Sequence, residues 1–67
     1  MKVTFAAVVY SRVSVETAIA EFAPFCRCAV GNLTDDATTV EFGDECSLMV
    51  AREFSNRVLH HALTERS

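Results

Sequence analysis

The fold is decided by residues 46–65, CSLMVAREFSNRVLHHALTE, the longest stretch of the chain with one consistent period. Four apolar residues recur at steps of three and four, which places side chains on one face of a helix: Ala51, Phe54, Val58 and Ala62. Asp44 stands just ahead, where an aspartate caps a helix and suits its dipole. We therefore predict an amphipathic helix from Cys46 to Glu65.

The N-terminal segment from Val3 to Tyr10 is predicted to be a strand, because it is rich in β-branched and aromatic residues and holds no Gly or Pro. The two-residue period of a strand places Val3 and Phe5 on one face. The other face is also largely apolar and carries Thr4, Ala6, Val8 and Tyr10.

A shorter helix is predicted next, with Ser14 as its N-cap and an end near Pro24, which disfavours helical geometry at the residue before it. Its apolar residues recur at i, i+3, i+4 and i+7, and they are Val15, Ala18, Ile19 and Phe22. This spacing predicts a single buried face.

Two further strands are predicted, from Phe25 to Asn32 and from Thr38 to Phe42. Glycine, asparagine and two aspartates between Gly31 and Asp36 favour a turn that pairs them as a hairpin.

The element order β-α-β-β-α predicts one α+β domain over residues 1–67, a two-layer sandwich with a three-stranded sheet and both helices on one face. The first strand then lies at an edge of the sheet, beside either of the other two. The predicted core consists of Val3, Phe5, Val9, Ile19, Phe22, Val30, Val40, Phe42, Phe54 and Val58, with Phe54 at its centre.

Composition excludes several classes of function. The 67 residues include six basic and nine acidic side chains, for a net charge of −3, and the basic ones are scattered. Nucleic-acid binding is therefore not expected, nor is binding to an anionic membrane. No apolar run approaches the roughly 20 residues of a transmembrane helix, and no signal peptide is recognisable. We expect a cytoplasmic protein, which suits the odd number of cysteines.

Cysteines are the first candidates for chemistry. Cys26 and Cys28 lie two residues apart on a predicted strand, so both thiols should face the core as small hydrophobic groups. We expect the cysteines, Cys46 included, to be structural and reduced. The alternative is a metal- or redox-active mini-protein that uses Cys26, Cys28 and Cys46.

Histidines and carboxylates give no catalytic pattern. His60 and His61 are adjacent and diverge by about 100° on a helix, which disfavours shared metal chelation. We expect His60 in solvent and His61 as a partly buried hydrogen-bonding residue. Asp35 and Asp36 suit a turn. No nucleophile elbow, phosphate loop or paired-carboxylate motif is present. We therefore expect no enzyme, no catalytic or metal residues and no cofactor.

An interface is predicted instead, because an apolar edge strand without charge, Pro or a bulge invites pairing. The surface would combine the outer face of the first strand with an apolar flank of the last helix: Thr4, Ala6, Val8, Tyr10, Leu48, Leu59 and Leu63. A homodimer or a larger protein partner would cover it.

Three parts of the chain carry a family resemblance. They are the Tyr10-Ser11 strand end with the helix through Val15, Ala18 and Phe22, then the hairpin, then the closing run EFSNRVL at 53–59 with Ala62-Leu63 and Arg66. Over roughly Phe5 to Arg66 the chain resembles the HxsD proteins of His-Xaa-Ser peptide-modification systems. The resemblance implies a non-enzymatic accessory protein whose partner is a radical-SAM peptide-modifying enzyme or its peptide substrate. It implies no catalytic residues.

Overall fold

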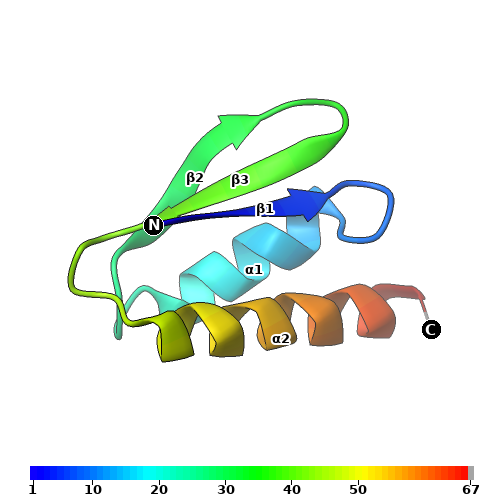
Figure 1. Cartoon of the computed structure of the whole chain (residues 1–67). Coiled ribbons are helices and arrows are strands. Elements are labelled where there is room, and N and C mark those ends of the chain that lie inside the picture. The colour runs from blue at the N-terminus through cyan, green and yellow to red at the C-terminus, as the bar shows by residue number, and fades with distance from the viewer. Residues whose placement is uncertain (67) are drawn as a thin grey trace.

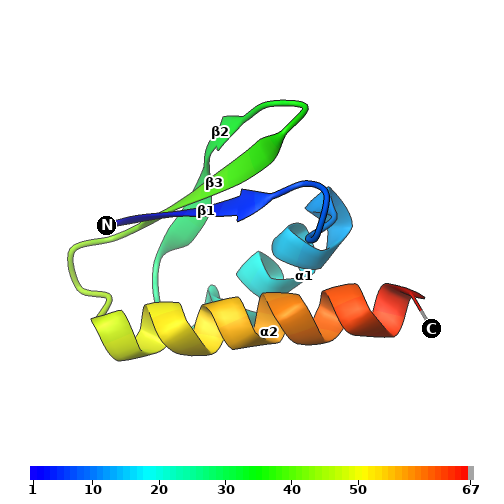
Figure 2. The same cartoon turned by 45° about the vertical axis from the view of Figure 1, so that its right-hand side comes forward.

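The computed structural model describes residues 1–66, with side chains for residues 1–65, so the Arg66 side chain, which belongs to the resemblance, lies outside the described side chains. It consists of β1 (Lys2–Ala6), α1 (Arg12–Phe22), β2 (Cys28–Leu33), β3 (Ala37–Phe42) and α2 (Leu48–Arg66) (Figure 1). The predicted order and the α+β class are confirmed. Both helices lie on the same side of the sheet (Figures 1 and 2).

The sheet has the strand order β1-β3-β2, and both pairings are antiparallel. This order settles which neighbour the first strand takes, a choice that the sequence left open. The central strand β3 places Val40 opposite Val3 of β1 and opposite Val30 of β2. Both β1 and β2 are therefore edge strands.

Strand β1 is shorter than predicted and ends at Ala6 instead of Tyr10. The carbonyl oxygen of Ala6 accepts hydrogen bonds from the backbone N–H groups of Val9 (3.1 Å) and Tyr10 (2.9 Å), which closes a turn. Val8 and Tyr10 therefore do not continue the open face of the strand. Val8 is exposed in the turn, whereas Tyr10 is half-buried with its ring edge against Phe5.

Both helix caps differ from the predicted ones. Ser11, not Ser14, caps α1, because its Oγ accepts a hydrogen bond from the Ser14 backbone N–H (3.1 Å). At α2 the Oγ of Ser47 accepts from the Val50 N–H (3.2 Å), so Asp44 is not the cap. A turn closed by Cys46 N–H and Gly43 O (3.0 Å) delays the start of α2.

Phe54 is the centre of the core, as predicted, and it is fully buried. Its ring lies 5.2 Å from the Phe42 ring, 5.4 Å from Phe22 and 5.8 Å from Phe5, measured between centroids. One side chain of α2 thus contacts β1, β3 and α1, in edge-to-face or tilted geometries that aromatic pairs prefer. Seven other predicted core residues are buried or half-buried: Val3, Phe5, Ile19, Phe22, Val40, Phe42 and Val58.

Val9 and Val30 were wrongly assigned to the core, and each is 39% exposed. Val9 lies in the turn after β1. Val30 shares the core-facing side of the sheet with Val40, but the β2-β3 hairpin rises away from the helices toward its tip (Figure 1). The helices therefore leave this part of the sheet uncovered.

Replacing Phe54 with alanine should lower the free energy of unfolding by about 3–5 kcal/mol, since it removes a buried ring and leaves a cavity. Phe25→Ala is the matched control, because the Phe25 side chain is 81% exposed and should contribute roughly 0.5 kcal/mol or less. Urea unfolding followed by circular dichroism measures both. Equal stability of the two variants would contradict the assigned core.

Candidate functional site

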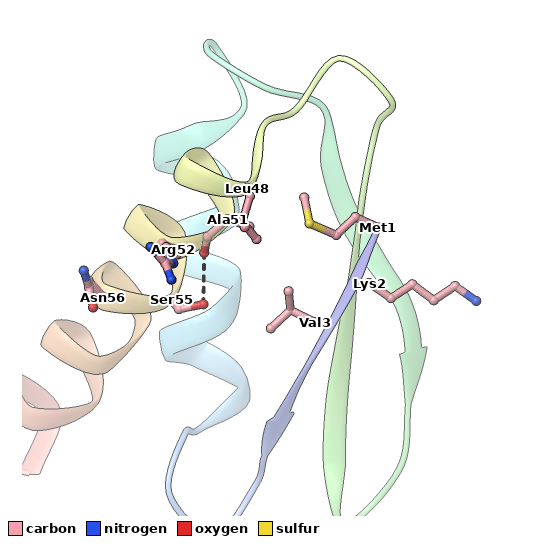
Figure 3. A pocket seen from close by; sticks show the side chains of 8 residues that line it. All are labelled: Met1, Lys2, Val3, Leu48, Ala51, Arg52, Ser55 and Asn56. Atoms are coloured by element: carbon pink, nitrogen blue, oxygen red, sulfur yellow. Dashed lines mark hydrogen bonds between the residues drawn. The ribbon is translucent and has the colours of Figure 1, made fainter.

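A groove of about 490 Å³ separates β1 from the N-terminal half of α2 (Figure 3). Its volume falls within the range of roughly 300–1,000 Å³ that is usual for ligand pockets. It is lined by Met1, Lys2, Val3, Leu48, Ala51, Arg52, Ser55 and Asn56. The groove therefore lies between the first strand and the last helix, which are far apart in the sequence.

The groove is apolar at its centre and polar at its rim. Val3 points from β1 toward α2, whereas the Lys2 side chain points away from the helix (Figure 3). The Lys2 ammonium lies 3.7 Å from the Glu41 carboxylate on the open face of the sheet. Ser55 donates its hydroxyl to the Ala51 carbonyl (3.0 Å), so this hydroxyl is already bonded within α2.

The outer edge of β1 presents unpaired backbone groups toward the groove. Met1 O accepts from Phe42 N–H (2.8 Å), and Ala7 N–H donates to Asp36 O (2.8 Å). These bonds fix the phase of the antiparallel ladder, in which alternate residues turn their N–H and C=O toward β3. The residues between them therefore turn these groups outward: Lys2, Thr4 and Ala6. The Ala6 carbonyl closes the turn, so within the described residues the outward N–H and C=O groups of β1 are both unpaired only at Lys2 and Thr4.

The predicted interface residues fall in three places. Thr4 and Ala6 are exposed on the outer face of the sheet, where the Thr4 hydroxyl bonds the Thr39 hydroxyl (3.1 Å). Val8 and Tyr10 belong to the turn after β1. Leu48, Leu59 and Leu63 are exposed and share one face of α2 with Arg52 and Ser55, at helical steps of three and four. Of the predicted interface residues, only Leu48 lines the groove.

Sequence reasoning missed most of the groove. Met1, Val3 and Arg52 line the groove but are not among the predicted interface residues. A usable signal existed on the helix, since Ala51, Arg52 and Ser55 lie three, four and seven residues after Leu48. No comparable signal identifies which strand faces them.

The expected reduced state of the cysteines was wrong for two of them. Cys26 and Cys46 form a disulfide with Cα atoms 5.7 Å apart, and it ties the segment before β2 to the loop before α2. Cys26 precedes β2 instead of lying within it, so the strand argument did not apply to it. Cys28 is a free thiol buried in the core, as predicted, and burial raises its pKa.

His61 is a partly buried hydrogen-bonding residue, as expected, and His60 is exposed. The His61 Nε2 atom lies 2.6 Å from Glu21 Oε1, which joins α2 to α1. This hydrogen bond is the main cause that lowers the pKa of Glu21, and the nearby charges of His61 and Arg57 act in the same direction.

A second link between the helices was not foreseen. The Glu65 carboxylate accepts hydrogen bonds from the Ser11 hydroxyl (2.7 Å) and from the buried Ser14 hydroxyl (2.6 Å). It anchors the end of α2 to the start of α1, where a negative charge also suits the helix dipole. We interpret this cluster as a structural anchor.

Within the described residues, no group of three or more His, Cys, Asp or Glu side chains is arranged to hold a metal ion. Over the same residues, no helix combines the length and apolarity needed to cross a membrane. We found no match to the chain among protein-family models, curated proteins or solved structures.

The Glu21 contact gives a pH-dependent prediction. Because the folded pKa of Glu21 lies below its unfolded value, its carboxylate stabilises the fold above the usual glutamate range of about pH 4. This contribution is lost as the pH falls through the lowered folded pKa. Glu21→Gln should therefore lower Tm at pH 6, and the deficit should shrink toward pH 3.

Thermal melts at both pH values check this, with Glu53→Gln as the control for loss of one exposed carboxylate on α2. A Tm deficit of Glu21→Gln that stays constant down to pH 3 would contradict the assigned contact.

Proposed function

We propose that the protein is a non-enzymatic interaction module that engages a protein partner through the groove between β1 and α2. One observation carries the proposal: an apolar groove adjoins a strand edge with unpaired N–H and C=O groups at Lys2 and Thr4. Unpaired strand edges are templates for pairing with another chain. The exposed leucines of α2 extend the apolar surface beside it.

The resemblance to HxsD proteins supplies a biological setting for this proposal. It suggests an accessory role beside a radical-SAM enzyme that modifies a peptide. A surface suited to polypeptide backbone fits either the enzyme or its peptide substrate. A second copy of the chain is the other partner that the same surface admits.

Two neighbouring residues allow a matched test. Leu48 lines the groove and is 65% exposed, whereas Met49 is 72% exposed and does not line it. Leu48→Glu should abolish partner binding, because it places a charge in the apolar part of the groove. Met49→Glu adds the same charge one residue away and should bind normally. Affinity purification of tagged protein from its native cells, with quantitative mass spectrometry, measures the partner recovered.

The proposal predicts a partner in stoichiometric amount with the unmodified protein and with Met49→Glu, and its loss with Leu48→Glu. Recovery of a radical-SAM enzyme or of its peptide substrate in that complex would support the accessory role that the resemblance suggests. Equal recovery with both variants would rule out the groove as the binding surface. Sedimentation of the purified protein identifies a homodimer if one forms.

Redox activity is a second candidate, for which the Cys26–Cys46 disulfide supplies a pair of cysteines that can be oxidised and reduced. The bond lies immediately before α2, so its reduction would release the loop that positions the groove residue Leu48. A redox role requires both states to occur in cells, whereas a purely structural disulfide stays oxidised. The cytoplasmic location stays a prediction. A disulfide that persists is uncommon in that compartment, whereas one that is regularly reduced is compatible with it.

Acid quenching of cells followed by alkylation and mass spectrometry counts the Cys26 and Cys46 thiols directly. A redox protein should show a mixture of both states that shifts with oxidant. The double variant Cys26→Ser/Cys46→Ser should remain folded with about 2–4 kcal/mol less stability, as expected for loss of a disulfide. A pair that is fully oxidised under all growth conditions would exclude the redox function.

A further inference from the structure

We propose that the groove binds an extended peptide segment of another protein, which adds to β1 as a fourth strand and places a carboxylate beside Arg52. This inference rests on the proposed function and deepens it by naming the chemistry of the partner. It draws on three features of the structure: the free edge of β1, the apolar wall of α2 and the charge at the groove rim.

The backbone of β1 is suited to strand addition. Its outward N–H and C=O groups at Lys2 and Thr4 are two residues apart, which is the spacing at which an incoming strand offers its own N–H and C=O groups. The added strand would lie about 4.7–4.9 Å from β1. Strand β1 pairs with β3 without irregularity. The other edge strand, β2, has a register shift between Val30 and Asn32. Such a bulge protects an edge from pairing, so β1 is the edge that remains open.

The side chains beside β1 specify what the added strand carries. Alternate residues of a strand point to the same face of a sheet, so every second side chain of the peptide would point toward the helices, as Val3 does. On that side they meet Leu48 and Ala51 of α2 (Figure 3). Apolar side chains at alternate positions of the peptide would fill the groove.

Charge selects the remaining feature of the peptide. Lys2 and Arg52 are the charged residues of the groove lining, and both are cationic although the chain has a net charge of −3. Lys2 is paired with Glu41, but no ion pair to Arg52 occurs within the described residues. A guanidinium binds a carboxylate through two parallel hydrogen bonds. We therefore assign an aspartate or glutamate of the peptide to Arg52.

The same charge argues against a second copy as the occupant. A two-fold related copy would present its own cationic groove lining and no acidic lining residue to satisfy Arg52. An acidic segment from another protein supplies the carboxylate that a second groove lining lacks. Pairing of two copies is then an outcome that the experiment must be able to detect.

The test begins with selection from a phage-displayed library of random 12-residue peptides on the purified protein. Selected peptides should share alternating apolar residues and at least one Asp or Glu. The best peptide is then synthesised with single N-methyl groups at successive positions, which remove one N–H at a time. Strand addition predicts Kd values raised tenfold or more at every second position and unchanged between them.

Variants of the protein test the assigned contacts. Thr4→Pro removes the outward N–H, whereas Thr4→Val keeps it and removes only the hydroxyl, so only the proline variant should weaken binding. Arg52→Glu should redirect selection toward basic peptides. Arg57→Glu is the control, because it makes the same charge change outside the groove lining.

Several outcomes would overturn the proposal: no enriched peptide, N-methyl effects without a two-residue period, or an unchanged preference with Arg52→Glu. A stable dimer of the protein that excludes the peptide would also overturn it. A partner that depends on Leu48 but competes with no linear peptide would reject the added strand and leave the interaction module standing.

Discussion

The packing of the Phe54 ring is the interaction on which the rest of the structure depends. It contacts Phe5 of β1, Phe42 of β3 and Phe22 of α1, so it joins both layers of the sandwich at one point. A domain of this size buries only about 60% of the surface that its unfolded chain exposes, so a single large buried ring makes up much of its core. The position of α2 under the sheet follows from this contact.

The groove is a consequence of that position. A helix that buries the stripe containing Phe54 and Val58 must expose the neighbouring stripe, about 60–100° around its axis. In this chain the neighbouring stripe begins with Leu48 and Arg52 and lies beside β1, whose outer edge has no partner strand. The disulfide before α2 holds the start of the same helix. Core packing, loop restraint and strand order thus create one recognition surface.

Much of the fold could be predicted because it rests on periodic patterns. The helical stripe around Phe54 and the antiparallel hairpin are local features, and both are present. The end of β1 was missed because Ala6 closes a turn that apolar residues such as Val8 do not signal. The Cys26–Cys46 bond and the approach of β1 to α2 are long-range contacts. Spacing along the chain cannot specify such contacts, so half of the candidate site was out of reach.

Amide hydrogen exchange along β1, followed by NMR at low protein concentration, tests the free strand edge most directly. Amides that point toward β3, those of Val3 and Phe5, should exchange slowly. The Thr4 and Ala6 amides point away from β3, at the outer edge of the sheet, and should exchange at rates close to those of an unstructured peptide. Protection of the Thr4 amide as strong as that of Val3 would show that the edge is already occupied and would contradict the account.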